Sequence, residues 1–133
     1  MKKTFLSISA LAIALVFASS CKKAGTGGDA TLVVFAKHHG VIIPNQANYP
    51  DSVFVKFNTE ELPSNPTTNY DALFVGEAGE DHIHCENLKT GKYYIYCTGW
   101  DTNIGQRVTG GMALKIKWKD RKDEIDTDVA VTE

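Results

Sequence analysis

The chain has 133 residues, a formal net charge of −2, 43% hydrophobic residues and 23% charged residues. This length fits one ordinary domain and leaves no room for a separate substrate-binding domain. The composition is that of a folded protein, and the absence of a basic surplus removes the electrostatic attraction on which nucleic-acid binding depends. We therefore expect no nucleic-acid partner. Three cysteines remain, and an odd count in an exported protein implies a separate fate for one of them.

The first twenty residues have the pattern of an export signal. A positively charged start, MKK, is followed by an apolar run from Phe5 to Ala18 and then by small residues. A membrane-spanning helix needs about 20 apolar residues, so this run is too short to be one. It suits the apolar core of a cleaved signal peptide, and we expect residues 1–20 to be removed.

The segment Ala18-Ser19-Ser20-Cys21 resembles the lipobox of bacterial lipoproteins, in which small residues precede a cysteine that is lipid-modified and becomes the mature N-terminus. The resemblance implies that Cys21 is the lipid-attachment residue and that the protein sits on a membrane. Several acyl chains on one cysteine give stable anchoring. Lys22 stands where the family associates Asp with retention at the inner membrane. The resemblance therefore implies a cell-envelope protein of the outer membrane, facing the periplasm or the cell surface.

Residues 21–29, CKKAGTGGD, follow this anchor and are rich in glycine and poor in apolar side chains. That composition is typical of a flexible tether. We expect one domain at residues 30–133.

From residue 30 onward, short runs of alternating apolar and polar residues are separated by Gly, Pro, Asn and Asp, a pattern that indicates an all-β fold. We predict a single Greek-key sandwich of about seven strands, at residues 31–37, 52–57, 72–75, 81–85, 92–98, 112–119 and 124–131. In the clearest run, MALKIKWK, alternation predicts a core-facing side for Met112, Leu114, Ile116 and Trp118 and a solvent-facing side for the lysines. About 100 residues suffice for one core.

The run from Ile83 to Ile95, IHCENLKTGKYYI, resembles the F-x-F-x-x-L-x-x-G-x-Y-x-L core of transthyretin-like, or prealbumin-like, sandwiches, which include Cna-B-type repeats and carboxypeptidase regulatory-like domains. Upstream, GVIIPNQA at residues 40–47 is similar to their strand entry. The resemblance implies that the strands on either side of Gly91 belong to facing sheets. Members of this family are mostly spacers and binding modules, so it implies neither an enzyme nor a cofactor.

Alternation around Gly91 also places several side chains on one inward face: Ile83, Cys85, Leu88, Tyr93, Ile95 and Cys97. Cys85 and Cys97 are the even pair that remains once Cys21 is lipidated. In an oxidising compartment they could form a disulfide between the sheets. The alternative is two buried free thiols that pack as small apolar residues.

His82 and His84 alternate around Ile83, so both side chains point outward if Ile83 points inward. Two imidazoles at this spacing can chelate a metal ion, and a third ligand could come from His38, His39, Glu80 or Asp81. The alternative is an ordinary solvated strand face.

The densest aromatic cluster comprises Tyr93, Tyr94, Tyr96 and Trp100. Alternation places Tyr94 and Tyr96 outside the sandwich, where together with Trp100 they could bind a glycan or another envelope protein. Pairing with side chains of a neighbouring strand is the alternative explanation.

Together these patterns predict a lipid-anchored, non-catalytic β-sandwich of the cell envelope with a structural or partner-binding role. The alternative function is a periplasmic or surface metal-binding protein that uses His82 and His84.

Overall fold

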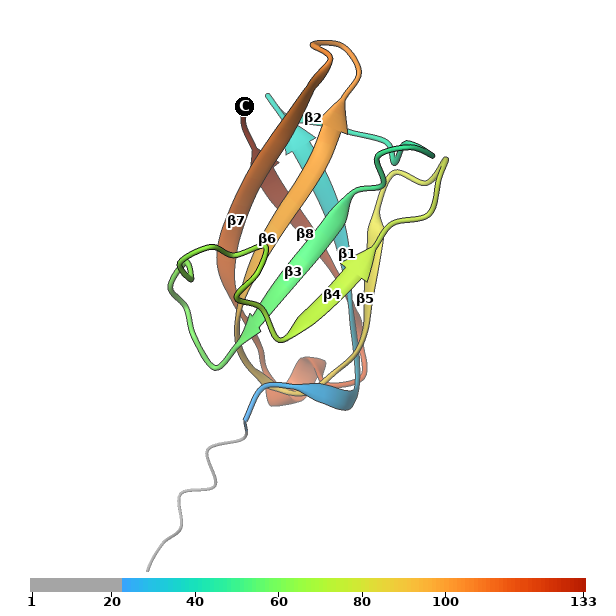
Figure 1. Ribbon diagram of the computed structural model, residues 1–133. Helices are drawn as coiled ribbons and strands as arrows, with labels where there is room; N and C mark the ends of the chain where they lie inside the picture. Colours follow the sequence, from blue (N-terminus) through green and yellow to red (C-terminus); the bar gives the residue numbers. More distant parts are fainter. Residues whose placement is uncertain (1–22) are drawn as a thin grey trace, which may run out of the picture.

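The computed structural model describes residues 23–133, which form two packed sheets of four strands each (Figure 1). The predicted all-β sandwich is confirmed. The predicted signal peptide at residues 1–20 and Cys21, the predicted lipid-attachment residue, lie outside the described residues. Within residues 23–133, no helix is long and apolar enough to cross a membrane.

Eight strands make up the two sheets. They are β1 (Thr26–His38), β2 (Val41–Ile42), β3 (Ser52–Phe57), β4 (Ala72–Val75), β5 (Ile83–Leu88), β6 (Gly91–Asp101), β7 (Gln106–Ile116) and β8 (Glu124–Val131), with a short 3₁₀ segment, η1 (Trp118–Asp120), between β7 and β8. In the first sheet β1 pairs with β5 and β2 along one edge and with β8, in parallel, along the other. The second sheet is antiparallel, in the order β4-β3-β6-β7.

The strands predicted at 52–57, 72–75 and 124–131 have the predicted bounds. The other four are displaced or extended at their ends, and β2 was not predicted. The parallel pairing of β1 with β8 was also not predicted, because alternation carries no information about strand direction.

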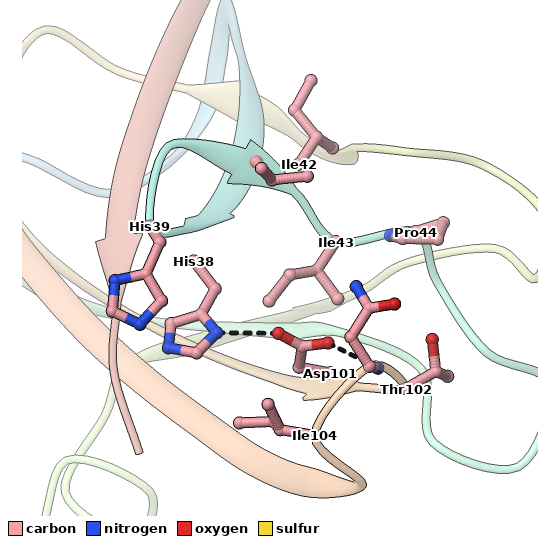
Figure 2. A pocket seen from close by; sticks show the side chains of 10 residues that line it. His38, His39, Ile42, Ile43, Pro44, Asp101, Thr102 and Ile104 are labelled. Carbon is pink, nitrogen blue, oxygen red and sulfur yellow. Dashed lines mark hydrogen bonds and ion pairs between the residues drawn. The ribbon is translucent and has the colours of Figure 1, made fainter.

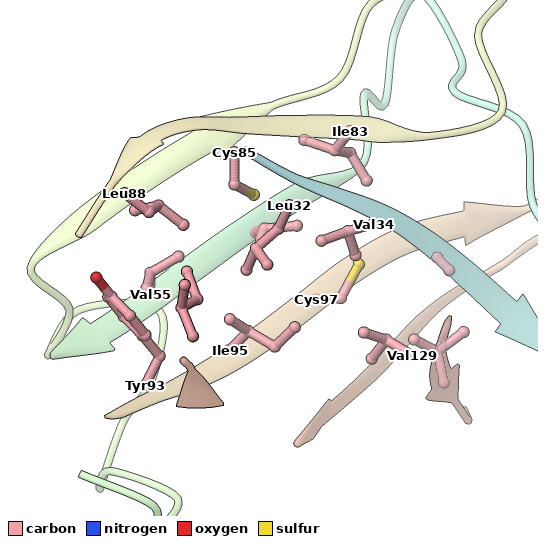
Figure 3. Close-up of a cluster of buried hydrophobic side chains, with 14 of the residues drawn as sticks. Leu32, Val34, Val55, Ile83, Cys85, Leu88, Tyr93, Ile95, Cys97 and Val129 are labelled. Carbon is pink, nitrogen blue, oxygen red and sulfur yellow. The ribbon is translucent and has the colours of Figure 1, made fainter. Parts of the chain in front are cut away.

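The core lies between the two sheets (Figure 3). The predicted inward face is confirmed, since each of its six residues is at most 1% exposed. Ile83, Cys85 and Leu88 come from β5, whereas Tyr93, Ile95 and Cys97 come from β6. The two strands belong to different sheets, so the expected facing arrangement is present.

The prediction that the whole apolar side of MALKIKWK faces the core is wrong at two positions. Ile116 is buried and Leu114 is half-buried, but Met112 is 36% exposed and Trp118 is 59% exposed. Met112 lies on β7, the outermost strand of its sheet. Trp118 lies beyond the end of β7, in η1, where strand alternation no longer applies.

The segment expected to be a tether belongs mostly to the sandwich. Ala24 is buried and β1 begins at Thr26, so the folded unit starts earlier than residue 30. The glycines here serve close packing: a Cβ at Gly28 would collide with the Leu88 carbonyl, and Gly27 has φ +91 next to a shift in the β1–β5 register. Composition indicated flexibility where the structure requires glycine for steric reasons.

Tyr93 holds this entry segment in place. Its hydroxyl donates to the carbonyl of Lys89 at 2.6 Å and accepts the N–H of Gly25 at 3.0 Å. The Lys89 N–H in turn donates to the Gly25 carbonyl at 2.8 Å. Gly91, with φ +149, allows Ala24 to approach so closely that a Cβ there would lie 2.7 Å from the Ala24 nitrogen. The chain is therefore fixed to the sandwich from Ala24 onward.

Asp51, just before β3, is the one buried carboxylate in the described chain with an oxygen, Oδ1, that has no hydrogen-bond partner. The residue is 1% exposed. Burial raises the pKa of its carboxyl from 3.8 to about 6, and the donation of the Trp100 backbone N–H offsets only part of this increase. An ionised Asp51 at neutral pH therefore destabilises the fold.

We expect Asp51→Asn to raise the melting temperature at neutral pH, by about 4 °C if about 1 kcal/mol is relieved. The folded protein retains a proton that the unfolded chain releases between pH 3.8 and about 6, so wild-type stability falls across that range. The difference between the two proteins should therefore vanish below about pH 4 and grow until about pH 7. Thermal melts across this range measure it. The exposed Asp126→Asn should give a difference that does not follow this profile, and parallel curves for wild type and Asp51→Asn would contradict the assignment.

Candidate metal centre

The two histidines of the His-Ile-His run lie at the start of β5, His84 within the strand and His82 just before it. Ile83 and Cys85 fill the core between the sheets. The two imidazoles therefore occupy the outer face of the first sheet, as alternation predicted. His82 also lies against the ring of Phe35 on β1, with ring centroids 5.6 Å apart.

The imidazoles are turned toward each other. The Nε2 atoms of His82 and His84 are 3.0 Å apart. Glu80 adds a carboxylate whose Oε2 lies 3.9 Å from His82 Nε2, and one ligand atom from each of the three residues lies within 4.8 Å of the others. Of the four candidate third ligands, Glu80 is the one that joins the histidine pair in this group.

These separations suit a single metal ion. With Zn–N bonds of about 2.0 to 2.1 Å, a tetrahedral centre places two nitrogen ligands about 3.3 Å apart. The His82–His84 separation of 3.0 Å is close to this value. Glu80 is somewhat farther away, and its side chain has free rotamers through which to approach. A fourth position would be filled by water or a ligand.

The second ring nitrogen of each histidine faces a carboxylate. His82 Nδ1 donates to Asp81 Oδ1 at 2.7 Å, and this hydrogen bond lowers the pKa of the Asp81 carboxyl. His84 Nδ1 lies 4.0 Å from Glu124 Oε1 on β8. The hydrogen bond from His82 Nδ1 favours the tautomer with its lone pair on Nε2, which is the arrangement found behind histidine ligands in metal sites, and that Nε2 accepts a hydrogen bond from His84 Nε2. Asp81, a candidate third ligand, thus orients His82.

Asn45 holds the backbone at Glu80 and His82 in place. Its buried side chain donates from Nδ2 to the carbonyls of Glu80 (3.1 Å) and His82 (3.0 Å), and its Oδ1 accepts the N–H of Asp51 at 2.9 Å. Gly76 packs directly against this amide, where a Cβ would collide with it. Sequence reasoning missed this role of Asn45, although an Asn beside a proline in a loop is a recognised signal for side-chain to backbone hydrogen bonding.

The centre opens onto a surface hollow of about 320 Å³. Its lining includes Glu80 and His84 together with two further acidic residues, Glu77 and Glu86. The negative charge of this lining attracts cations, and the opening gives an ion a path to the ligand atoms.

The other two candidate third ligands, His38 and His39, lie elsewhere, beside a cavity of about 230 Å³ (Figure 2). The buried His38 binds Asp101 Oδ2 through Nδ1 at 2.7 Å and Glu133 Oε2 through Nε2 at 2.9 Å. The hydrogen bond to Asp101 raises the pKa of His38 more than burial lowers it. The His39 ring lies against that of His38, with centroids 4.1 Å apart. This cluster ties the ends of β1 and β6 to the end of the chain.

Cys85 and Cys97 are both free and buried, so the second of the two alternatives for this pair is the one present. Burial raises the pKa of both thiols far above the usual range, which makes them neutral, apolar-like core residues.

The aromatic cluster is partly explained by packing. Tyr94 and Tyr96 are half-buried on the outer face of the second sheet, and Tyr94 covers Gly111 on the neighbouring strand β7. Trp100 stacks on Tyr49 with centroids 4.5 Å apart. This pair borders a hollow of about 330 Å³ that Arg107 also lines. Trp100, rather than the two tyrosines, is thus the predicted residue with a surface recess beside it.

Comparison of the chain with protein-family models, with curated proteins and with solved structures finds no match.

We expect Asn45→Ala to destabilise the fold by about 1 to 3 kcal/mol, because it removes the acceptor of the buried Asp51 N–H and the side-chain donor to the His82 carbonyl, whereas the Glu80 carbonyl still accepts the backbone N–H of residue 45. Urea denaturation measures this change. The neighbouring amide of Gln46 offers a matched control, since its side chain bonds only to the Pro44 carbonyl in the described structure. Gln46→Ala should change stability by less than about 0.5 kcal/mol. Equal effects of the two substitutions would show that the Asn45 contacts contribute little.

Proposed function

We propose that this chain is a lipid-anchored, non-catalytic module of the cell envelope that binds a divalent transition-metal ion through Glu80, His82 and His84. The observation that carries the proposal is the convergence of two imidazole nitrogens, 3.0 Å apart, with a carboxylate 3.9 Å from one of them. The Asp81 carboxylate that binds His82 Nδ1 at 2.7 Å also favours a metal site over a chance pair of surface histidines.

The ligand chemistry favours a borderline metal. Two imidazoles and one carboxylate suit Zn²⁺ and also Cu²⁺, whereas Mg²⁺ and Ca²⁺ prefer oxygen ligands alone. The deeply buried thiols of Cys85 and Cys97 take no part, because they face the core on the other side of the sheet. Zn²⁺ is therefore the natural probe.

The anchoring half of the proposal rests on the lipobox resemblance at Ala18 to Cys21 and on the export signal before it. The transthyretin-like identity of the sandwich is likewise proposed, on the residue pattern from Ile83 to Ile95. An envelope glycan or protein is a second candidate ligand, favoured by the hollow of about 330 Å³ beside Tyr49 and Trp100.

Calorimetric titration with Zn²⁺ should give one saturable site, and His84→Gln should weaken it by at least about tenfold, because even the loss of a residue behind a ligand costs 10- to 100-fold. Glu80→Gln should also weaken binding. The metal should be released by a chelator without loss of the fold, since the core does not depend on it.

His39→Asn is the control for this titration, because His38, His39 and Glu133 are the other group of described residues whose ligand atoms lie close enough together to hold a metal ion. His39 is an exposed imidazole in a turn, with φ 50, a conformation that Asn adopts readily. Its loss should leave the affinity unchanged. If wild type and His84→Gln bind Zn²⁺ equally, or if His39→Asn removes binding, the centre proposed here is not the binding site.

Cys21→Ala should transfer the protein from the membrane fraction to the soluble fraction, because it removes the residue that carries the acyl chains. Cys85→Ala is the matched control: it removes a thiol that is buried in the core and should leave the protein on the membrane. Mass spectrometry of the N-terminal peptide should detect the acyl groups on Cys21. Membrane association that persists in Cys21→Ala would contradict lipid anchoring.

A further inference from the structure

We propose that one end of the sandwich, here called the basic end, lies directly against an anionic lipid surface. This inference rests on the proposed lipid anchor and adds the orientation of the domain on the membrane. The basic end comprises Lys23, Lys89, Lys92, Lys115, Lys117, Trp118, Lys119, Arg121 and Lys122.

The contacts of the entry segment bring these residues together. Ala24 packs against Gly91, which pairs with Ile116 at the end of β7, and Lys117 to Lys122 follow directly. Gly25 and Lys89 are joined through their backbones. Figure 1 shows the start of β1, the turn between β5 and β6, and η1 gathered at the same end of the molecule. The described chain therefore enters the sandwich in the middle of this basic surface.

The charge of the basic end opposes that of the chain as a whole. It carries eight basic residues, whereas the whole chain has a net charge of −2. Within residues 23–133, two of the lysines form salt bridges, Lys92 with Glu60 at 3.0 Å and Lys119 with Asp120 at 3.9 Å. Lys92 and Lys115 stand directly opposite each other on β6 and β7, an unfavourable arrangement that a negative surface would relieve.

Trp118 stands in the middle of these charges and is 59% exposed. The Arg121 guanidinium lies 4.3 Å from its ring centroid and donates to the Trp118 carbonyl. Indole rings are enriched at the interface between lipid headgroups and hydrocarbon, where an apolar ring and a polar N–H are both accommodated. An exposed tryptophan that lies between Lys117 and Lys119 in the chain and contacts Arg121 thus fits a membrane interface better than a purely polar partner.

Chain length determines how close this end comes to the membrane. Two residues lie between Cys21 and the fixed Ala24, so three Cα–Cα steps join them, a reach of at most about 11 Å. The Debye length at physiological ionic strength is about 8 Å, so even with this link fully extended the lysines around Ala24 lie about one and a half Debye lengths from the headgroup charge, and any shorter conformation brings them closer. A nine-residue tether would have allowed the sandwich to stand clear of the membrane, but that segment is fixed to the sandwich from Ala24 onward, and β1 begins at Thr26.

The test uses Cys21→Ala protein, which lacks the acyl chains, and flotation with vesicles of phosphatidylcholine alone or mixed with phosphatidylglycerol. We expect binding to the anionic vesicles, loss of binding at high salt, and no binding to phosphatidylcholine alone. Lys117→Gln with Lys119→Gln should reduce the partition coefficient by about tenfold or more. Trp118→Ala should reduce it as well. Lys37→Gln with Arg107→Gln makes the same change in net charge away from the basic end and should have little effect.

The outcomes separate this inference from the anchor. If wild type is acylated and membrane-bound but the Cys21→Ala protein does not bind anionic vesicles, the orientation proposed here is wrong and the anchor stands. If the Cys21→Ala protein binds anionic vesicles while wild type carries no acyl group, the basic end is a lipid-binding surface and the anchor is wrong. Retention on heparin without vesicle binding, or equal loss in both lysine pairs, would overturn the inference.

Discussion

The pairing of β1 along both of its edges is the constraint on which the rest of the structure depends. Because β5 and β8 both pair with the stretch from Leu32 to Val34, the two strands are fixed on opposite sides of β1 and in register with each other. This register brings Glu124 to the same face as His84, across the intervening strand. β1 runs from the basic end, where it begins at Thr26, to the opposite end of the sandwich, where it ends at His38. The direction of this strand therefore determines which residues lie at each end.

Alternation of apolar and polar residues predicted what depends on one strand alone. The bounds of β3, β4 and β8 and the inward face around Gly91 follow from the two-residue period. The outward direction of His82 and His84 follows for the same reason. Contacts between two segments that are distant in the chain could not be predicted from the sequence. The Glu124 carboxylate lies 40 residues from His84 in the chain, and only the β1 register joins them.

The errors have physical causes of the same kind. Met112 has the correct phase for a core residue, but β7 is an edge strand and the opposite sheet does not cover the whole of its inner face. Gly27 and Gly28 have the composition of a tether, yet Gly28 is needed because a Cβ there would collide with the Leu88 carbonyl, and Gly27 because its backbone has φ +91. A single sequence does not distinguish a glycine needed for flexibility from one needed for close packing. Asn45 was visible as a turn residue, but its bonds to the Glu80 and His82 carbonyls depend on a loop that is 35 residues away.

The basic end and the candidate metal centre lie at different positions along β5. Their separation determines whether both can act in the same membrane-bound orientation. β5 runs from Ile83 to Leu88, with Leu88 opposite Thr26 near the basic end, so His82 lies about six residues farther along, roughly 20 Å at 3.3 Å per residue. With the basic end against lipid, the candidate metal centre would lie above the headgroups and outside their Debye length. The electrostatic potential of its acidic hollow would then be independent of the membrane charge. The anionic surface would neither draw metal ions away from the hollow nor cover its opening. The fold therefore allows a membrane-bound orientation and an accessible metal site at once, because β5 holds the two surfaces apart as one rigid strand.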